Sequence, residues 1–166
     1  TGRISLAFDN KFSENKIIYA TTDAKVTSTS KERIFRFTIG KSTSWQSIYG
    51  SLPDNAIIKK VAIANDGTLY AVNTQAISTA DKKGSVVRAL NPTYSAPTFE
   101  TMLRGLEDTI TLNKLSVCGN QLWTVDTKNT RLMTFSDSLS LPVTLVSPDD
   151  KASGLDTASL NLKWQT

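Results

Sequence analysis

The chain has 166 residues, of which 39% are hydrophobic and 20% are charged. This length suits one ordinary domain, and this composition excludes a disordered polar chain. No apolar run approaches the roughly 20 residues that span a bilayer, so we expect no membrane insertion. The net charge of +4 comes from basic residues that stand singly or in pairs. A nucleic-acid surface concentrates its basic residues, so we expect no nucleic-acid partner.

Histidine is absent from the sequence, and Cys118 is the only cysteine. This excludes histidine-activated nucleophiles, most zinc, copper and non-haem iron sites, and an internal disulfide. Gly40, Lys41 and Ser42 lack the upstream glycine of a phosphate-binding loop. We therefore predict no catalytic residues, no cofactor and no metal site, and we expect Cys118 to be a buried strand residue. Paired carboxylates, as in glycoside hydrolysis, are the one catalytic option that remains.

Short alternating or apolar runs predict strands in three successive groups. The first group covers residues 4–8, 16–21, 33–37 and 45–52, and the second covers residues 60–64, 68–72, 85–90 and 99–106. The third covers residues 114–118, 121–125 and 130–135. Asn65, Asp66 and Gly67 predict a tight hairpin between the first two strands of the second group. The three groups occupy about residues 1–56, 57–111 and 112–146.

The groups resemble one another at aromatic positions in their second strands. Tyr19, Tyr70 and Trp123 follow one another at spacings of 51 and 53 residues, close to the roughly 50 residues of the longer propeller blades. Trp45 in the first group aligns with Phe99 in the second. We expect Trp45 and Trp123 to pack in the core at these repeat positions rather than to stack on ligands.

Arginines also recur, because Arg36 and Arg88 occupy equivalent places in the third strands. Repetition favours a shared structural role over one unique site. A single small sheet cannot bury both of its faces, so such units must stack on one another. We therefore predict an all-β fold of about three consecutive four-stranded antiparallel propeller-type blades over residues 1–146.

Three blades are fewer than the four to eight of typical closed propellers. Two explanations stay open. Either the parent chain holds further blades, or two copies form a homodimer that completes a ring.

The order of strands and turns resembles Asp-box (BNR-like) propellers of the sialidase, sortilin and photosystem-assembly types. In that family a Ser-x-Asp-x-Gly-x-Thr-Trp turn follows the third strand. Gly40 and Trp45 hold the matching places here, whereas Ile39 stands where the Asp is expected. The turn is reduced to Phe99 in the second group and is absent from the third. The resemblance covers about residues 4–146 and implies a fold more than an activity.

Residues 147–166 differ from the repeats. Ser147 and Pro148 lead through an acidic stretch to the alternating run Leu160–Trp164. Two interpretations stay open for this run: a closing strand that pairs with the first blade, or the first strand of an immunoglobulin-like or fibronectin type III-like domain.

These observations predict a non-enzymatic binding or structural module of an extracellular or cell-surface protein, with a protein or glycan ligand. The alternatives are a fragment of a sialidase-type glycoside hydrolase and an assembly factor that docks on a protein complex. A sialidase gathers an arginine triad, a tyrosine–glutamate pair and an acid from several blades, and no such set is visible in the sequence.

Overall fold

The structure, a computed structural model, describes residues 4–22, 34–48, 52, 57–73, 85–103, 112–119, 121–137, 144–147 and 163–165. Within these ranges the predicted all-β fold is confirmed: the elements are antiparallel strands and one short helix, α1 (Phe12–Asn15). None of the helical residues among them forms a segment long and apolar enough to cross a membrane.

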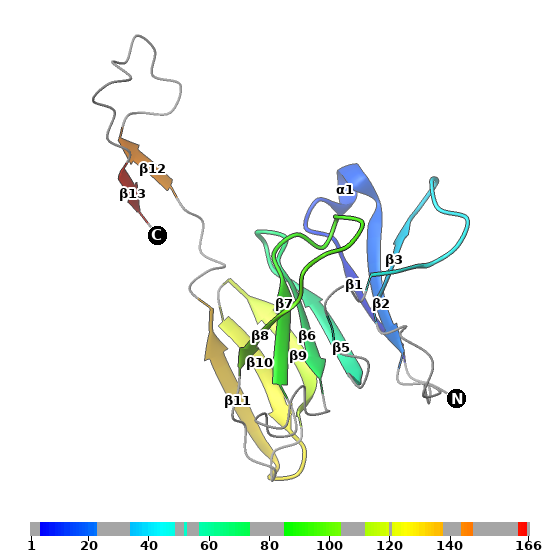
Figure 1. Cartoon of the computed structure of the whole chain (residues 1–166). Helices are drawn as coiled ribbons and strands as arrows, with labels where there is room; N and C mark the ends of the chain where they lie inside the picture. Colours follow the sequence, from blue (N-terminus) through cyan, green and yellow to red (C-terminus); the bar gives the residue numbers. More distant parts are fainter. Residues whose placement is uncertain are drawn as a thin grey trace.

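Three larger antiparallel sheets follow one another along the described parts of the chain (Figure 1). The first contains, in order, β1 (Ile4–Phe8), β2 (Ile17–Thr22), β3 (Ile34–Thr38) and β4 (Gln46–Ser47). The second contains β5 (Ile58–Ile63), β6 (Leu69–Asn73), β7 (Ser85–Ala89) and β8 (Glu100–Leu103). The third contains β9 (Leu112–Cys118), β10 (Gln121–Asp126) and β11 (Arg131–Ser136). Each strand pairs with the next one along the chain, as expected of a meander.

Within the described residues, the fourth strands cover part of the predicted ranges, and residues 49–51 and 104–106 of those ranges lie outside the described residues. In the first sheet, the strand expected over residues 45–52 is limited to β4 (Gln46–Ser47). In the second sheet, β8 (Glu100–Leu103) lies inside the predicted range of 99–106.

The tail forms a separate pair of strands, β12 (Thr144–Ser147) and β13 (Lys163–Gln165). Among the described residues, β13 therefore pairs with β12 and not with β1. Leu160 lies outside the described residues.

The three sheets share one pairing register around the second strand. In each, an aromatic residue of that strand lies opposite a small residue of the first strand and a third-strand residue. The sets are Ala7–Tyr19–Arg36, Ala62–Tyr70–Arg88 and Ser116–Trp123–Thr134. Arg36 and Arg88 continue the correspondence, because they pair with Gln46 and Glu100 in the fourth strands.

The predicted hairpin between β5 and β6 has the expected turn. The Ala64 N–H donates to the Thr68 carbonyl at 3.0 Å, and the Asp66 carboxylate accepts from the Thr68 N–H at 2.9 Å. Gly67 has a φ of +92°, in the left-handed region that favours glycine. A Cβ at Gly67 would also lie 3.2 Å from Asn10 Oδ1 in the first sheet's loop.

The second sheet is packed between the other two. All five residues of β6 are buried, and their side chains alternate between two cores. Leu69 and Ala71 belong to a core shared with Tyr19 and Ile34 of the first sheet. Tyr70 and Val72 belong to a second core that contains Leu112 and Leu122 of the third sheet. Figure 1 shows the sheets side by side, with β5 between β1 and β9.

Candidate functional site

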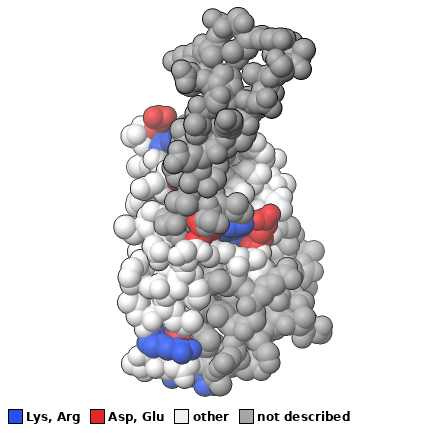
Figure 2. Space-filling view, turned by 90° about the vertical axis from the view of Figure 1, so that its left-hand side faces the viewer, with Lys and Arg blue, Asp and Glu red and all other residues white. Residues whose placement is uncertain are grey.

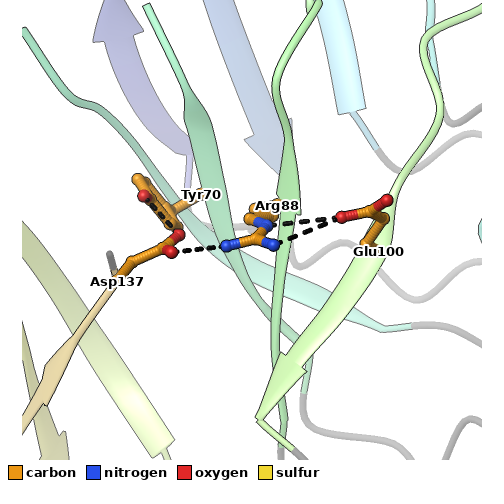
Figure 3. Close-up of polar contacts among 4 residues, drawn as sticks. All are labelled: Tyr70, Arg88, Glu100 and Asp137. Carbon is orange, nitrogen blue, oxygen red and sulfur yellow. Dashed lines mark hydrogen bonds and ion pairs between the residues drawn. The ribbon is translucent and has the colours of Figure 1, made fainter. Parts of the chain in front are cut away.

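A set of charged and polar side chains lies where the second sheet meets the third. Tyr70 comes from β6, Arg88 from β7 and Glu100 from β8, whereas Asp137 directly follows β11 (Figure 3). We call these four residues the Arg88 cluster. Two strands of the second sheet thus present donors to the carboxylate that follows β11, and a third strand presents Glu100 to Arg88.

Asp137 accepts two hydrogen bonds in this cluster. Arg88 Nη1 donates to Asp137 Oδ1 at 2.5 Å, and the Tyr70 hydroxyl donates to Asp137 Oδ2 at 2.8 Å. On its other side, Arg88 lies 3.4 Å from Glu100 Oε2 through both Nε and Nη2. The Arg88 and Asp137 side chains are only 11% and 4% exposed, whereas Glu100 is half exposed.

The negative charges of Asp137 and Glu100 compensate for the burial of the Arg88 guanidinium. Burial by itself would lower the pKa of Arg88, but hydrogen bonds to Asp137 and Glu100 and their negative charges raise that pKa above its ordinary value. Arg88 therefore stays cationic between two carboxylates. The Tyr70 ring is fully buried, and its hydroxyl proton lies in the hydrogen bond to Asp137. The chemistry of the cluster is that of a charged bridge between two sheets.

Arg36 makes a corresponding bridge between the first and second sheets. Arg36 Nη1 donates to the carbonyls of Pro92 and Tyr94, at 3.0 and 2.9 Å. Its Nη2 donates to Gln46 Oε1 at 2.7 Å. Pro92 and Tyr94 follow β7 just as Asp137 follows β11. Each arginine thus contacts the segment that follows the third strand of the next sheet in the sequence. The two arginines therefore have the same structural role, as their equivalent positions predict.

Tyr19 sits at the same register position as Tyr70 but binds within its own sheet. Its hydroxyl donates to Asp9 Oδ2 at 3.1 Å, and Asp9 also accepts from the Lys11 N–H and from Asn15 Nδ2. Burial raises the pKa of Tyr19 above its usual range, the charge of Asp9 and the hydrogen bond to it raise it further, and Arg36 opposes them. Tyr19 is therefore a neutral hydrogen-bond donor.

Two expectations about side-chain burial are wrong. Trp45 and Trp123 are 45% and 40% exposed rather than packed in the core. Trp45 contacts the Phe37 ring at a centroid distance of 5.3 Å, and Trp123 lies on the face of the third sheet that points away from the second. Cys118 is exposed for the same reason, because it lies on that outward face of β9.

The remaining predicted anchors lie in the first core and in a turn. Phe99 is buried in the core that contains Tyr19. Gly40 stands in the turn after β3 with a φ of +80°. These residues do not converge on the Arg88 cluster, which holds only Tyr70 among the predicted anchors.

Asp137 and Asp9 were not identified from the sequence, although one signal pointed to Asp137. The family resemblance marks the position three residues after the third-strand arginine, where the first group has Ile39. The same count from Thr134 in the third group arrives at Asp137. A comparison of the third strands by register finds this residue.

Comparison with known proteins assigns no family to this chain. The chain matches no protein-family model, and no curated protein is significantly similar to it. Within the described residues, no group of three or more His, Cys, Asp or Glu side chains is arranged to hold a metal ion. The function must therefore be inferred from the site itself.

Proposed function

We propose that the chain is a non-enzymatic binding or structural module built from propeller-type blades. The observation that carries this proposal is the pair of equivalent arginine bridges, from Arg36 to the second sheet and from Arg88 to the third. Blades of a repeat protein contact their neighbours through the same positions in every repeat. The burial of both faces of β6 supports the same stacking.

The role of the Arg88 cluster supports a non-enzymatic module. Arg88 is engaged by two carboxylates, and Tyr70 is buried beneath the third sheet. A sialidase-type site needs arginines and a tyrosine that face the substrate. Here the same residue types face each other across two sheets, so the cluster disfavours the glycosidase alternative.

The proposal includes a protein or glycan ligand and a location outside the cell or at its surface. The exposed Trp45 and Trp123 rings support ligand binding, since exposed aromatic side chains contribute contact area to interfaces. The Ser- and Thr-rich sequence supports the location. Docking on a protein complex, as an assembly factor does, is the same binding role with a larger partner.

A combined binding and hydrolysis experiment tests the proposal. The chain is applied to a glycan array and incubated with a panel of fluorogenic glycosides, alongside Glu100→Gln and the control Glu14→Gln. Both glutamates are solvent-exposed, but only Glu100 belongs to the cluster. We expect no turnover by any of the three proteins. Hydrolysis that falls in Glu100→Gln and persists in Glu14→Gln would overturn the proposal in favour of a glycosidase.

A further inference from the structure

The first sheet presents an exposed apolar face along β1. Ile4, Leu6 and Phe8 alternate along this strand and point to the same side, and Leu6 and Phe8 are 55% and 56% exposed. Large contiguous apolar surface of this kind is typical of an interface rather than of a free protein surface.

The chain itself shows what covers these positions. Ile4, Leu6 and Phe8 lie opposite the second-strand residues that stand three after, one after and one before the aromatic residue of that strand. The register places Ile58, Val61 and Ile63 of β5, and Leu112, Leu115 and Val117 of β9, at the same positions. In β5 they pack on the first sheet, and in β9 they pack on the second. In both cases these residues are covered by the preceding sheet, on the face that carries the aromatic residue of its second strand. We call this its aromatic-bearing face.

The third sheet presents its own aromatic-bearing face, and this face is exposed. Tyr19 and Tyr70 are fully buried beneath the following sheet, but their counterpart Trp123 is exposed. Leu132 of β11 is exposed as well, and it lies on the same face because its partner Val125 is two residues from Trp123. The exposed Lys114 also lies on this face, because it pairs with Val125. From the side on which β11 lies in Figure 1, the described surface is white apart from a charged group near the middle and a basic patch at the lower end (Figure 2). We call this the Trp123 face, and the opposite end the β1 face.

At these two faces, both the arginine and the residue that corresponds to its acceptor are replaced by uncharged residues. At the internal junctions, a third-strand arginine reaches the segment that follows the next third strand. On the Trp123 face that arginine position is Thr134. On the first sheet the position that corresponds to Asp137, three residues after Arg36, is the exposed Ile39. Joining the two ends therefore leaves no arginine without an acceptor and no carboxylate without a donor at this position.

We propose that the β1 face of one copy of this chain packs on the Trp123 face of a second copy, and that the reverse contact closes the pair. The occupant is a second copy because each end face continues an interface that the chain already makes internally. The described residues of two copies contribute six larger sheets, within the four to eight of closed propellers. Such a head-to-tail contact closes when the two copies are related by a two-fold rotation. This inference rests on the blade arrangement of the proposed function.

Analytical ultracentrifugation of the 166-residue chain tests the association. We expect a dimer, and we expect Leu6→Asp and Trp123→Asp each to weaken it by about 100-fold or more, because each places an unpaired charge in an apolar contact. Leu90→Asp changes an exposed leucine that directly follows β7 and is the matched control; it leaves the dimer intact. Far-UV circular dichroism checks that each variant is folded.

Mixing the two variants separates head-to-tail from face-to-same-face packing. Leu6→Asp keeps an intact Trp123 face, and Trp123→Asp keeps an intact β1 face. In the proposed arrangement a mixture therefore regains one sound contact and forms heterodimers more tightly than either variant alone. A dimer disrupted by only one of the two substitutions, with no gain on mixing, would contradict head-to-tail packing.

Cys118 provides a readout that needs no substitution. It lies on the outward face of β9 with Ser116, which pairs with Trp123. Its reaction with a thiol reagent should slow by about 10-fold or more when wild-type protein is concentrated through the dimerisation range, because a covered thiol reacts only after dissociation. A monomer at all concentrations with a constant Cys118 rate overturns the dimer. The unfolding free energies of Arg88→Ala, Asp137→Ala and the double variant then decide between two outcomes. If the double variant loses less than the sum of the single losses, Arg88 and Asp137 interact and the blade arrangement stands. If the losses add, the proposed function fails as well.

Discussion

Arg88 and Asp137 are separated by 49 residues in the sequence, and they form a buried ion pair from one sheet to the next. Tyr70 donates to the other oxygen of the same carboxylate. Each ion would be costly to bury alone, because several kcal/mol of hydration is lost and must be replaced by partners. The pair therefore makes the packing of the second and third sheets dependent on one defined alignment.

Removal of either member of this pair should destabilise the fold. Arg88→Ala leaves the Asp137 carboxylate buried with less compensation, and we expect it to lower the free energy of unfolding by about 3 kcal/mol. Asp137→Ala should have a similar effect, and the double variant should lose less than the sum. Urea unfolding at one fixed protein concentration measures all three. Lys41→Ala is the control, because it removes an exposed cation, and it should cost less than about 0.5 kcal/mol. Additive losses would show that Arg88 and Asp137 do not interact.

The stability contributed by Tyr19 should depend on pH. Its folded-state pKa is raised above the ordinary value of 10.0 by burial and by Asp9, so the folded protein favours the neutral phenol. This contribution is complete below about pH 10 and is lost as the pH rises above it, because the unfolded chain then ionises first. At pH 7 we expect Tyr19→Phe to be about 1 kcal/mol less stable than the wild type.

Urea unfolding between about pH 7 and pH 11 tests this dependence. The difference between wild type and Tyr19→Phe should shrink with rising pH. The control is Tyr94→Phe, which changes an exposed ring and should alter stability by less than about 0.5 kcal/mol. A difference between wild type and Tyr19→Phe that grows above pH 10 would contradict the assignment of Tyr19 as a buried neutral donor.

The three aromatic positions should differ in their contribution to stability although they share a register. Tyr19→Ala and Tyr70→Ala remove fully buried rings, and each should cost about 3–5 kcal/mol. Trp123→Ala removes an exposed ring and should cost less than about 1 kcal/mol within a single chain. These variants are best compared in the Leu6→Asp background, where association does not add to stability. Equal losses at all three positions would mean that Trp123 is covered within its own chain.

Two glycines allow a backbone effect to be separated from a contact between sheets. Gly40 and Gly67 both have positive φ, so an alanine at either position should cost about 1–2 kcal/mol. At Gly67 the new Cβ would also meet Asn10, whose Nδ2 donates to the Asn65 carbonyl. At Gly40 no atom lies within 4 Å of that Cβ. Thermal or urea unfolding should therefore show a larger loss for Gly67→Ala than for Gly40→Ala, and the reverse order would argue against close contact between the two loops.

The local order of this protein could be predicted from its residue pattern alone. Alternating apolar residues predicted most of the strands within a few residues, because side chains on a strand point to opposite faces. The Asn65–Gly67 turn was predictable because a glycine accommodates the left-handed backbone that a tight hairpin needs. The equivalence of Arg36 and Arg88 was also visible in the sequence, and both arginines pair opposite a buried tyrosine.

Tertiary structure decided which of these equivalent positions are covered. Trp123 and Tyr70 have the same place in their sheets, but a neighbouring sheet covers Tyr70 and none of the described sheets covers Trp123. The partnership of Asp137 with Arg88 and Tyr70 was likewise hidden, because it joins residues from two sheets. Strand pattern is a property of neighbouring residues, whereas burial and ion pairing depend on surfaces that distant segments bring together.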